Sequence, residues 1–230
     1  MTTWDDQSWR RWVFIWCGLG ILALFWVAFT PLDEVISQRM YSRLWLDHHA
    51  ALVDGWYRWP KWVSICAALC VIGFALSGRN PLNGVAVRAP TRDYLVVGLL
   101  TIPVLTWLVR EGSASACPRD LVAFGGELAQ RPFLDFSWQA IGSGRCNPSG
   151  HMSSFSWWLA LCFLRPPQGL GLGVLILCIL AMFALGSVQI LKGAHFMSHL
   201  IFSLWWAGVV CLMLVRVCFL KRDIPTLKRR

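Results

Sequence analysis

Long apolar stretches separated by short polar segments run through most of the chain. Six of these stretches contain no Asp, Glu, Lys or Arg. Each approaches the length of about 20 residues that an α-helix needs to cross the ~30 Å core of a bilayer. The pattern predicts an all-α fold, an integral membrane bundle of six transmembrane helices, with residues 1–230 forming a single membrane domain. The predicted helices are 12–32, 62–78, 94–109, 150–166, 169–191 and 195–216.

The composition indicates a membrane protein and excludes an ordinary water-soluble enzyme. Hydrophobic residues make up 57% of the chain and charged residues 14%, against about 25% charged in a typical soluble domain. With both termini inside, more than half of the 21 Lys and Arg fall on the inner side, as the positive-inside rule requires. We therefore predict a multi-pass protein of a bacterial inner membrane, with both termini cytoplasmic and 110–149 as a periplasmic loop. The basic tail 221–230 is interpreted as an anchor to anionic headgroups, and no nucleic-acid partner is predicted.

Two of the nine cysteines differ from the rest by their position. Seven fall within or beside predicted helices, where cysteine packs as a small apolar side chain. Cys117 and Cys146 both lie in the predicted periplasmic loop, in a compartment that oxidises thiols. A disulfide between them would close a loop of about 30 residues and contribute about 3 kcal/mol in the chain-entropy description. The sequence leaves a bridge and two free thiols equally open.

Three histidines stand at the outward ends of predicted helices, where ionisable side chains indicate function. His151 follows a Pro-Ser-Gly tripeptide at the start of the fourth helix. His195 and His199, at the start of the sixth, are four residues apart and would share one helical face, with Cβ atoms about 6 Å apart. Basic residues at the same membrane face complete a cationic pocket suited to an anionic headgroup: Arg110, Arg119 and Lys192.

A zinc site is the alternative interpretation of these histidines. His-x3-His is an allowed metal spacing, and His151 could supply a third ligand. A zincin helix carries a Glu between its two histidines, and no Glu stands between His195 and His199. We therefore predict no metal and no other cofactor, and assign the histidines to covalent and acid-base chemistry.

The histidine segments resemble two motifs of the type 2 phosphatidic acid phosphatase superfamily, which includes membrane lipid phosphatases, glucose-6-phosphatase and the vanadium haloperoxidases. The signature of that superfamily is K-x6-R-P, then P-S-G-H, then S-R-x5-H-x3-D. The segment Pro148 to His151 matches the second motif in full, and Gly193 to His199, with the sequence GAHFMSH, matches the third in part. The resemblance covers roughly residues 94–215 and implies six helices with the motifs facing outward.

The third motif departs from the family signature at three positions. The nucleophilic histidine of the family falls on His195, whereas its Asp falls on His199 and its Ser-Arg pair on Val188 and Gln189. A guanidinium that binds phosphate through two hydrogen bonds is not matched by an amide. The segment G-A-H-F-x-S-H, together with a Cys-Pro first motif, resembles a bacterial subgroup of the superfamily.

The first motif also differs from the family pattern. Arg110, six further residues and then Cys117-Pro118 preserve the family spacing, with Arg in place of Lys and Cys in place of Arg. A competing placement on Arg131 and its following proline would put Phe124 at the first basic position. Phenylalanine cannot supply the positive charge, so the placement on Arg110 is preferred.

The resemblance implies a phosphohistidine mechanism. His195 would attack phosphorus, while His151 protonates the leaving oxygen and later activates water. His199 would accept a hydrogen bond from Nδ1–H of His195, as the family Asp does, but without a negative charge. The groups expected at the phosphate oxygens are the Ser149 hydroxyl, the Gly150 amide and the side chains of Arg110, Lys192, Gln189 and Arg119.

The function predicted from these residues is removal of a phosphate from a phosphorylated membrane lipid. The family implies phosphatidic acid, phosphatidylglycerophosphate, undecaprenyl pyrophosphate and lipid A phosphates as substrate candidates. A lipid phosphotransferase is the nearest enzymatic alternative, distinguished by the lack of free phosphate release. A non-catalytic relative that binds a phosphorylated lipid is the alternative of a different class, against which the two retained histidines argue.

Overall fold

The computed structural model describes residues 3–41, 43–78, 86–137 and 144–220, without the side chains of 43–48 and 50. The described part is mainly helical, and its β-structure consists of isolated bridge residues, among them the pair Leu121 and Leu128. The helices are α1 Asp6–Ala28, α2 Leu32–Met40, α3 Arg43–Ser77, α4 Ala89–Glu111, α5 Gly150–Ser153, α6 Trp157–Cys162, α7 Leu170–Leu191 and α8 Met197–Val215. The π-helical turn Arg216–Leu220 extends α8, and the loop after α4 contains two 3-10 turns, Pro118–Asp120 and Val122–Phe124.

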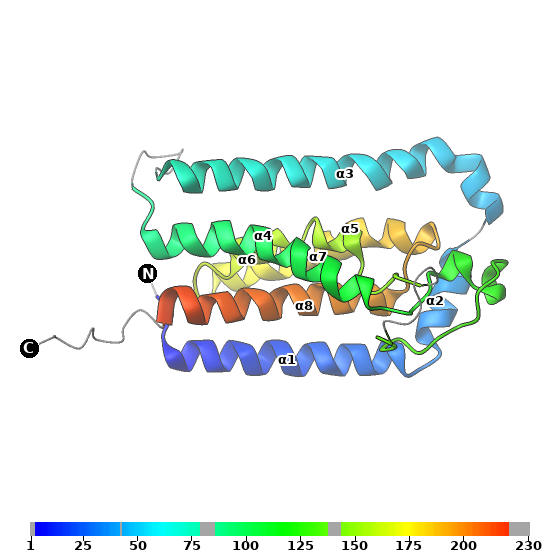
Figure 1. Ribbon diagram of the computed structural model, residues 1–230, viewed down its shortest axis with the longest axis horizontal. Helices are drawn as coiled ribbons and strands as arrows, with labels where there is room; N and C mark the ends of the chain where they lie inside the picture. Colours follow the sequence, from blue (N-terminus) through cyan, green and yellow to red (C-terminus); the bar gives the residue numbers. More distant parts are fainter. Residues whose placement is uncertain (1–2, 42, 79–85, 138–143, 221–230) are drawn as a thin grey trace, which may run out of the picture.

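The long helices lie side by side, with α8 at the centre of the bundle (Figure 1). α8 packs against α1, α4, α5, α6 and α7. In its most apolar stretch 56% of the residues are buried, against 11% in α3, which lies along one edge. α2 and the loop between α4 and α5 gather at one end of the bundle, where the turn between α7 and α8 also lies (Figure 1). This end carries the predicted site.

In the described part of the chain, five helices are long and apolar enough to cross a bilayer: Asp6–Ala28, Ala51–Ser77, Ala89–Glu111, Leu170–Leu191 and Met197–Leu220. They support a helical membrane protein with several segments able to span a bilayer. The predicted helix 150–166 differs, because the structure divides it into the short helices α5 and α6. Three serine hydroxyls in this segment, those of Ser153, Ser154 and Ser156, donate to backbone carbonyls three or four residues earlier. Such bonds compete with the helical backbone ladder and bend a helix.

Residues 33–61 lie between the first two predicted helices and were not predicted to be helical, but the structure forms helices there. They contain α2 and the first part of α3, which bends at His49 and includes Pro60. α1 likewise starts before the predicted boundary, because Asp5 accepts a hydrogen bond from the Ser8 amide and caps the helix. Helices continue through charged residues that reach water at the membrane surface. A search for uncharged stretches therefore underestimates their length.

Tryptophan side chains connect the N-terminal segment to α8 and to the end of α6, mainly toward the end of the bundle opposite the predicted site. Three indole N–H groups of the N-terminal segment donate to backbone carbonyls of α8 and of the residue that follows α6. The pairs are Trp4 with Phe163 at 2.9 Å, Trp9 with Leu212 at 2.7 Å and Trp16 with Trp205 at 2.9 Å. Arg216 forms an ion pair with Asp6 at the same end. The start of α1 and the end of α8 are therefore adjacent.

Candidate active site

Three buried histidines meet at the end of the bundle opposite Trp4 and Trp9. Only 8% of His151, 6% of His195 and 1% of His199 is exposed. They come from α5, from the turn between α7 and α8, and from the first turn of α8. The rings of His195 and His199 have centroids 5.8 Å apart, and the charges of His151 and Arg110 also act on His195. The structure therefore brings these four predicted site residues together.

The backbone of the turn between α7 and α8 fixes the position of His195. The amides of Ala194 and His195 donate to the Gln189 carbonyl at 2.8 and 3.3 Å, and the Arg119 amide donates to the Gly193 carbonyl at 2.9 Å. Gly193 has φ +60°, and an added Cβ there would lie 2.9 Å from the Tyr41 ring. Only glycine meets both conditions. The turn is thus held from α7 and from the loop after α4.

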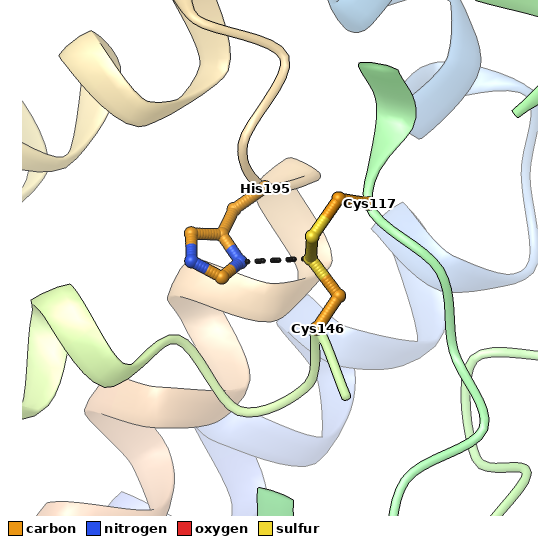
Figure 2. Close-up of side chains that lie close together, drawn as sticks. All are labelled: Cys117, Cys146 and His195. Carbon is orange, nitrogen blue, oxygen red and sulfur yellow. Dashed lines mark hydrogen bonds between the residues drawn. A yellow bond between two sulfur atoms is a disulfide. The ribbon is translucent and has the colours of Figure 1, made fainter. Parts of the chain in front are cut away.

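Cys117 and Cys146 are joined in a disulfide with their Cα atoms 5.3 Å apart. Figure 2 shows the imidazole of His195 beside this bridge, with Nδ1 3.3 Å from Sγ of Cys146. The same sulfur lies 3.0 Å from the Ala194 carbonyl oxygen. The two sulfurs and Nδ1 lie within 4.8 Å of one another, a spacing found in metal sites. Metals bind cysteine as thiolate, and both sulfurs are used in the bridge.

Arg110 lies in the last turn of α4 with its guanidinium against Gly150. Nε of Arg110 donates to the Arg145 carbonyl at 2.6 Å. A Cβ built on Gly150 would lie 2.9 Å from Nη1 of Arg110, so a side chain at this position would displace the guanidinium. The neighbouring charges of Arg145 and Glu111 pair with each other at 3.1 Å. Glu111 is therefore directed to Arg145, and the positive charge of Arg110 faces the site.

Ser149 and His151 are positioned by bonds to α8 and α3. The Ser149 hydroxyl accepts from the Met152 amide at 3.3 Å, and the Ser149 amide donates to the Ser203 hydroxyl at 2.7 Å. Nε2 of His151 lies 2.6 Å from the Tyr57 carbonyl oxygen, and the two rings have centroids 4.2 Å apart. A carbonyl only accepts, so Nε2 of His151 carries the proton. The Ser149 hydroxyl keeps its own proton available for donation.

The surroundings of His195 hold its imidazole neutral. Burial lowers the pKa of His195 well below its ordinary value, and electrostatic interactions with His199, Arg110 and His151 lower that pKa further. A hydrogen bond to the backbone of Cys146 opposes the shift. A neutral imidazole has one nitrogen lone pair and can act as a nucleophile.

His199 does not make the predicted bond to His195. Its Nε2 lies 3.0 Å from the Ser115 hydroxyl, its ring stacks on Phe133, and its buried Nδ1 has no hydrogen-bond partner in the described part of the chain. The atom beside Nδ1 of His195 is instead Sγ of Cys146. The prediction assumed that both histidines lie on one helix. α8 begins at Met197, so His195 belongs to the preceding turn.

Three of the predicted phosphate ligands are placed differently from Arg110, Ser149 and Gly150. Lys192 forms an ion pair with Asp54, and its ammonium lies 4.2 Å from the centroid of the Tyr57 ring, which stacks beside His151. Half of the Arg119 side chain is exposed, and Nε lies 3.7 Å from the Asp120 carboxylate. Gln189 is fully buried, and neither its amide oxygen nor its amide nitrogen has a partner among the described residues.

Asp33 is the main neighbour of the site that the sequence did not indicate. It caps α8, because its carboxylate accepts from the Ser198 amide at 3.0 Å and from the Ser198 hydroxyl. Burial raises the pKa of Asp33, while these hydrogen bonds lower it. Asp33 also lines a polar cavity of about 160 Å³ with His199 and Arg131. The rejected first-motif residue Arg131 thus lies beside this cavity, next to the site.

Comparison with known proteins yields no relative of the chain. No protein-family model, no curated protein and no solved structure matches it. Assignment of a function therefore depends on the residues of the site and on their geometry.

Proposed function

We propose that the protein is a membrane lipid phosphatase that transfers the phosphate of its substrate to His195 and then to water. The observation that carries this proposal is the convergence of three groups from separate segments. They are a buried neutral imidazole at His195, the guanidinium of Arg110 over Gly150, and a second imidazole at His151. Nucleophile, charge stabiliser and proton donor are the groups that phosphoryl transfer through histidine requires.

In the first step, Nε2 of His195 attacks phosphorus and the bond from phosphorus to the lipid oxygen breaks. The acid form of His151 carries protons on both ring nitrogens; Nδ1 gives its proton to that oxygen, and the lipid leaves as an alcohol. The Tyr57 carbonyl binds Nε2 of His151, which leaves Nδ1 for this proton transfer. Arg110 stabilises the charge that spreads over the phosphate oxygens, assisted by the Ser149 hydroxyl and the Gly150 amide.

In the second step, water attacks the phosphohistidine and its proton passes back to His151. The bond between phosphorus and Nε2 breaks, inorganic phosphate leaves, and both imidazoles return to their starting states. General acid-base catalysis of this kind contributes about 10²- to 10⁴-fold. The mechanism uses side chains of this chain alone.

A lipid is the proposed substrate because the site lies at one end of a bundle of apolar helices. We further propose that α5 and α6 together form a sixth crossing between the two ends. The Ser149 amide binds Ser203 in the first half of α8, whereas the Phe163 carbonyl binds Trp4 at the tryptophan end. Both termini then lie on one side. The basic residues favour the cytoplasm for that side of a bacterial inner membrane, and the tail 221–230 lies outside the described residues.

The test is phosphate release by the purified protein from a panel of lipid phosphates in the presence of EDTA. His195→Ala is measured alongside, with His49→Ala as the matched control at an exposed histidine. We expect release from at least one lipid, unaffected by EDTA, absent in His195→Ala and retained in His49→Ala. An acid-labile phosphoenzyme should form in the wild type.

Two other results would contradict the proposal. Transfer of a labelled phosphate from one lipid to another without release would identify a phosphotransferase. Binding of lipid phosphates to vesicle-reconstituted protein without release or transfer would identify a non-catalytic lipid-binding protein.

A further inference from the structure

We propose that the Cys117–Cys146 disulfide is a redox-sensitive positioning element that holds His195 in the Nδ1–H tautomer. The bridge would thereby keep Nε2 as the nucleophilic nitrogen only while it is oxidised. The part of this inference that concerns turnover rests on the proposed function. The part that concerns the tautomer stands on the geometry alone.

The first argument is the direction of the contact between His195 and the bridge. Nδ1 of His195 lies 3.3 Å from Sγ of Cys146 (Figure 2). A disulfide sulfur carries no proton, so a hydrogen bond between these atoms requires Nδ1–H as the donor. A neutral imidazole has one N–H, and the bond made by one nitrogen determines the state of the other. Nε2 is then left with its lone pair.

The second argument is that Cys146 supplies the acceptor at Nδ1. Its side chain is fully buried, and its backbone also acts on the pKa of His195. The charged and titratable groups that act on His195 are Arg110, His151 and His199. His199 is bonded to the Ser115 hydroxyl through Nε2. In other catalytic sites a carboxylate accepts from the imidazole and fixes its tautomer. In this protein Cys146 is the acceptor.

The third argument is the place of the bridge in the loop after α4. Cys117 directly precedes the 3-10 turn Pro118–Asp120, whose Arg119 amide holds the Gly193 carbonyl at 2.9 Å. Cys146 lies three residues before Ser149 and is held to Cys117 across a separation of 29 residues. The bridge thus connects the segment that fixes the His195 turn with the segment that presents Ser149 and Gly150.

Reduction changes the chemistry of this contact. A dithiol reductant gives two electrons and two protons to the bridge, the S–S bond breaks, and the reductant becomes a cyclic disulfide. Cys146 then bears an S–H group that donates as well as accepts, on a side chain free to rotate. Loss of the group that fixes the tautomer of a catalytic imidazole lowers turnover by up to about 10⁴-fold in other enzymes.

The tautomer is tested by nitrogen NMR of protein labelled with ¹⁵N-histidine, with His195→Asn identifying the signal. We expect the Nδ1–H pattern for His195 in the oxidised protein, and its loss after reduction and in the Cys117→Ser/Cys146→Ser variant. Mass spectrometry after thiol alkylation verifies the state of the bridge. An unchanged His195 signal in protein with a verified open bridge would overturn the inference.

Turnover is tested with the lipid phosphate that the panel identifies. Reduction should lower kcat at least about tenfold and leave KM within about twofold, with recovery on reoxidation. The double serine variant should be slow and insensitive to reductant. Cys66→Ser/Cys70→Ser is the matched control, because these thiols are free and exposed, and it should respond as the wild type does.

The outcomes separate the two proposals. If the His195 signal responds to reduction and no lipid phosphate is hydrolysed, the proposed function fails and the positioning role stands. If hydrolysis occurs with the same kcat in the oxidised and reduced protein, the positioning role fails and the phosphatase stands. If the Cys117→Ser/Cys146→Ser variant does not fold, the His195 signal and kcat are both measured on the reduced wild-type protein.

Discussion

The two ends of the bundle are held together in opposite ways. On the tryptophan side, the indole rings of Trp4, Trp9 and Trp16 pack between helices. Their N–H groups donate to backbone carbonyls at 2.7 to 2.9 Å. At the histidine end, a disulfide, short turns and buried polar side chains hold the chain. Among the described residues, some polar atoms there have no partner, including the Gln189 amide and Nδ1 of His199; the Tyr94 hydroxyl, beside Phe219 at the tryptophan end, also lacks one. A buried polar group without a hydrogen bond costs about 1 to 3 kcal/mol. The histidine end combines this cost with three buried imidazoles.

The largest expected effect comes from removing the nucleophile. His195→Ala should lower phosphate release at least about 10³-fold, because no other side chain replaces the attacking nitrogen. The melting temperature in detergent should stay close to that of the wild type, since the turn is held by backbone hydrogen bonds with Gln189 and Arg119. If His195→Ala melts at a much lower temperature and still releases phosphate, His195 would serve stability and not catalysis.

The next effect sharpens the role of Arg110. Gly150→Ala places a Cβ 2.9 Å from Nη1 of Arg110 and should displace the guanidinium. We expect kcat/KM to fall about 10- to 100-fold, the range that follows from losing about 1.5 to 3 kcal/mol of a charged hydrogen bond. Folding should persist, because the contacted atom is the end of a flexible side chain.

Gly171→Ala is the matched control for that substitution. A Cβ on Gly171, in the first turn of α7, meets nothing within 4 Å. Its kinetic constants should equal those of the wild type. If kcat/KM for the same lipid phosphate falls equally in both variants, the effect of alanine comes from a general change in the helices and not from displacement of Arg110.

Part of this arrangement could be predicted from the sequence. The motif residues Arg110, Ser149 and Gly150 do lie together, and α7 begins and ends within one residue of its predicted bounds. Apolar runs locate helices that lie in lipid, because such helices need uncharged surfaces. Motif spacing locates residues that one short segment positions by itself.

The remainder depends on contacts between distant segments. The Tyr57 carbonyl reaches His151 across 94 residues, and Ser115 reaches His199 across 84. Backbone carbonyls and single serines occur throughout the chain, so no pattern distinguishes the ones that meet a histidine. α2 was missed for a related reason, because its charged residues hide it from a search for apolar runs.

A third effect concerns pH, and its direction follows from the lowered pKa of His195. An unfolded histidine titrates near 6.5. Between that value and the lower folded pKa, the unfolded chain binds a proton that the folded chain does not. Stability should therefore fall as pH drops below about 6.5, by up to about 1.4 kcal/mol per pH unit, and should not vary through this group at higher pH.

Melting curves of the wild type and His195→Asn over the range from pH 8 to pH 5 isolate this contribution. The asparagine variant should lose less stability on acidification than the wild type. Parallel curves for the two proteins would show that His195 titrates normally in the folded state, and its place as a neutral nucleophile would then be wrong.

The smallest effect belongs to the tryptophan end. Trp9→Phe keeps an aromatic ring beneath the Arg216 guanidinium, which lies 4.9 Å from the Trp9 ring, and removes the N–H that binds the Leu212 carbonyl. A hydrogen bond of this kind contributes about 1 kcal/mol, so the melting temperature should fall by about 2 to 4 °C. Phosphate release should stay within about twofold of the wild type, because Trp9 and Leu212 lie at the end opposite the histidines. A large loss of activity with an unchanged melting temperature would mean that α1 and α8 transmit their packing to the site, and the two ends could no longer be treated as separate.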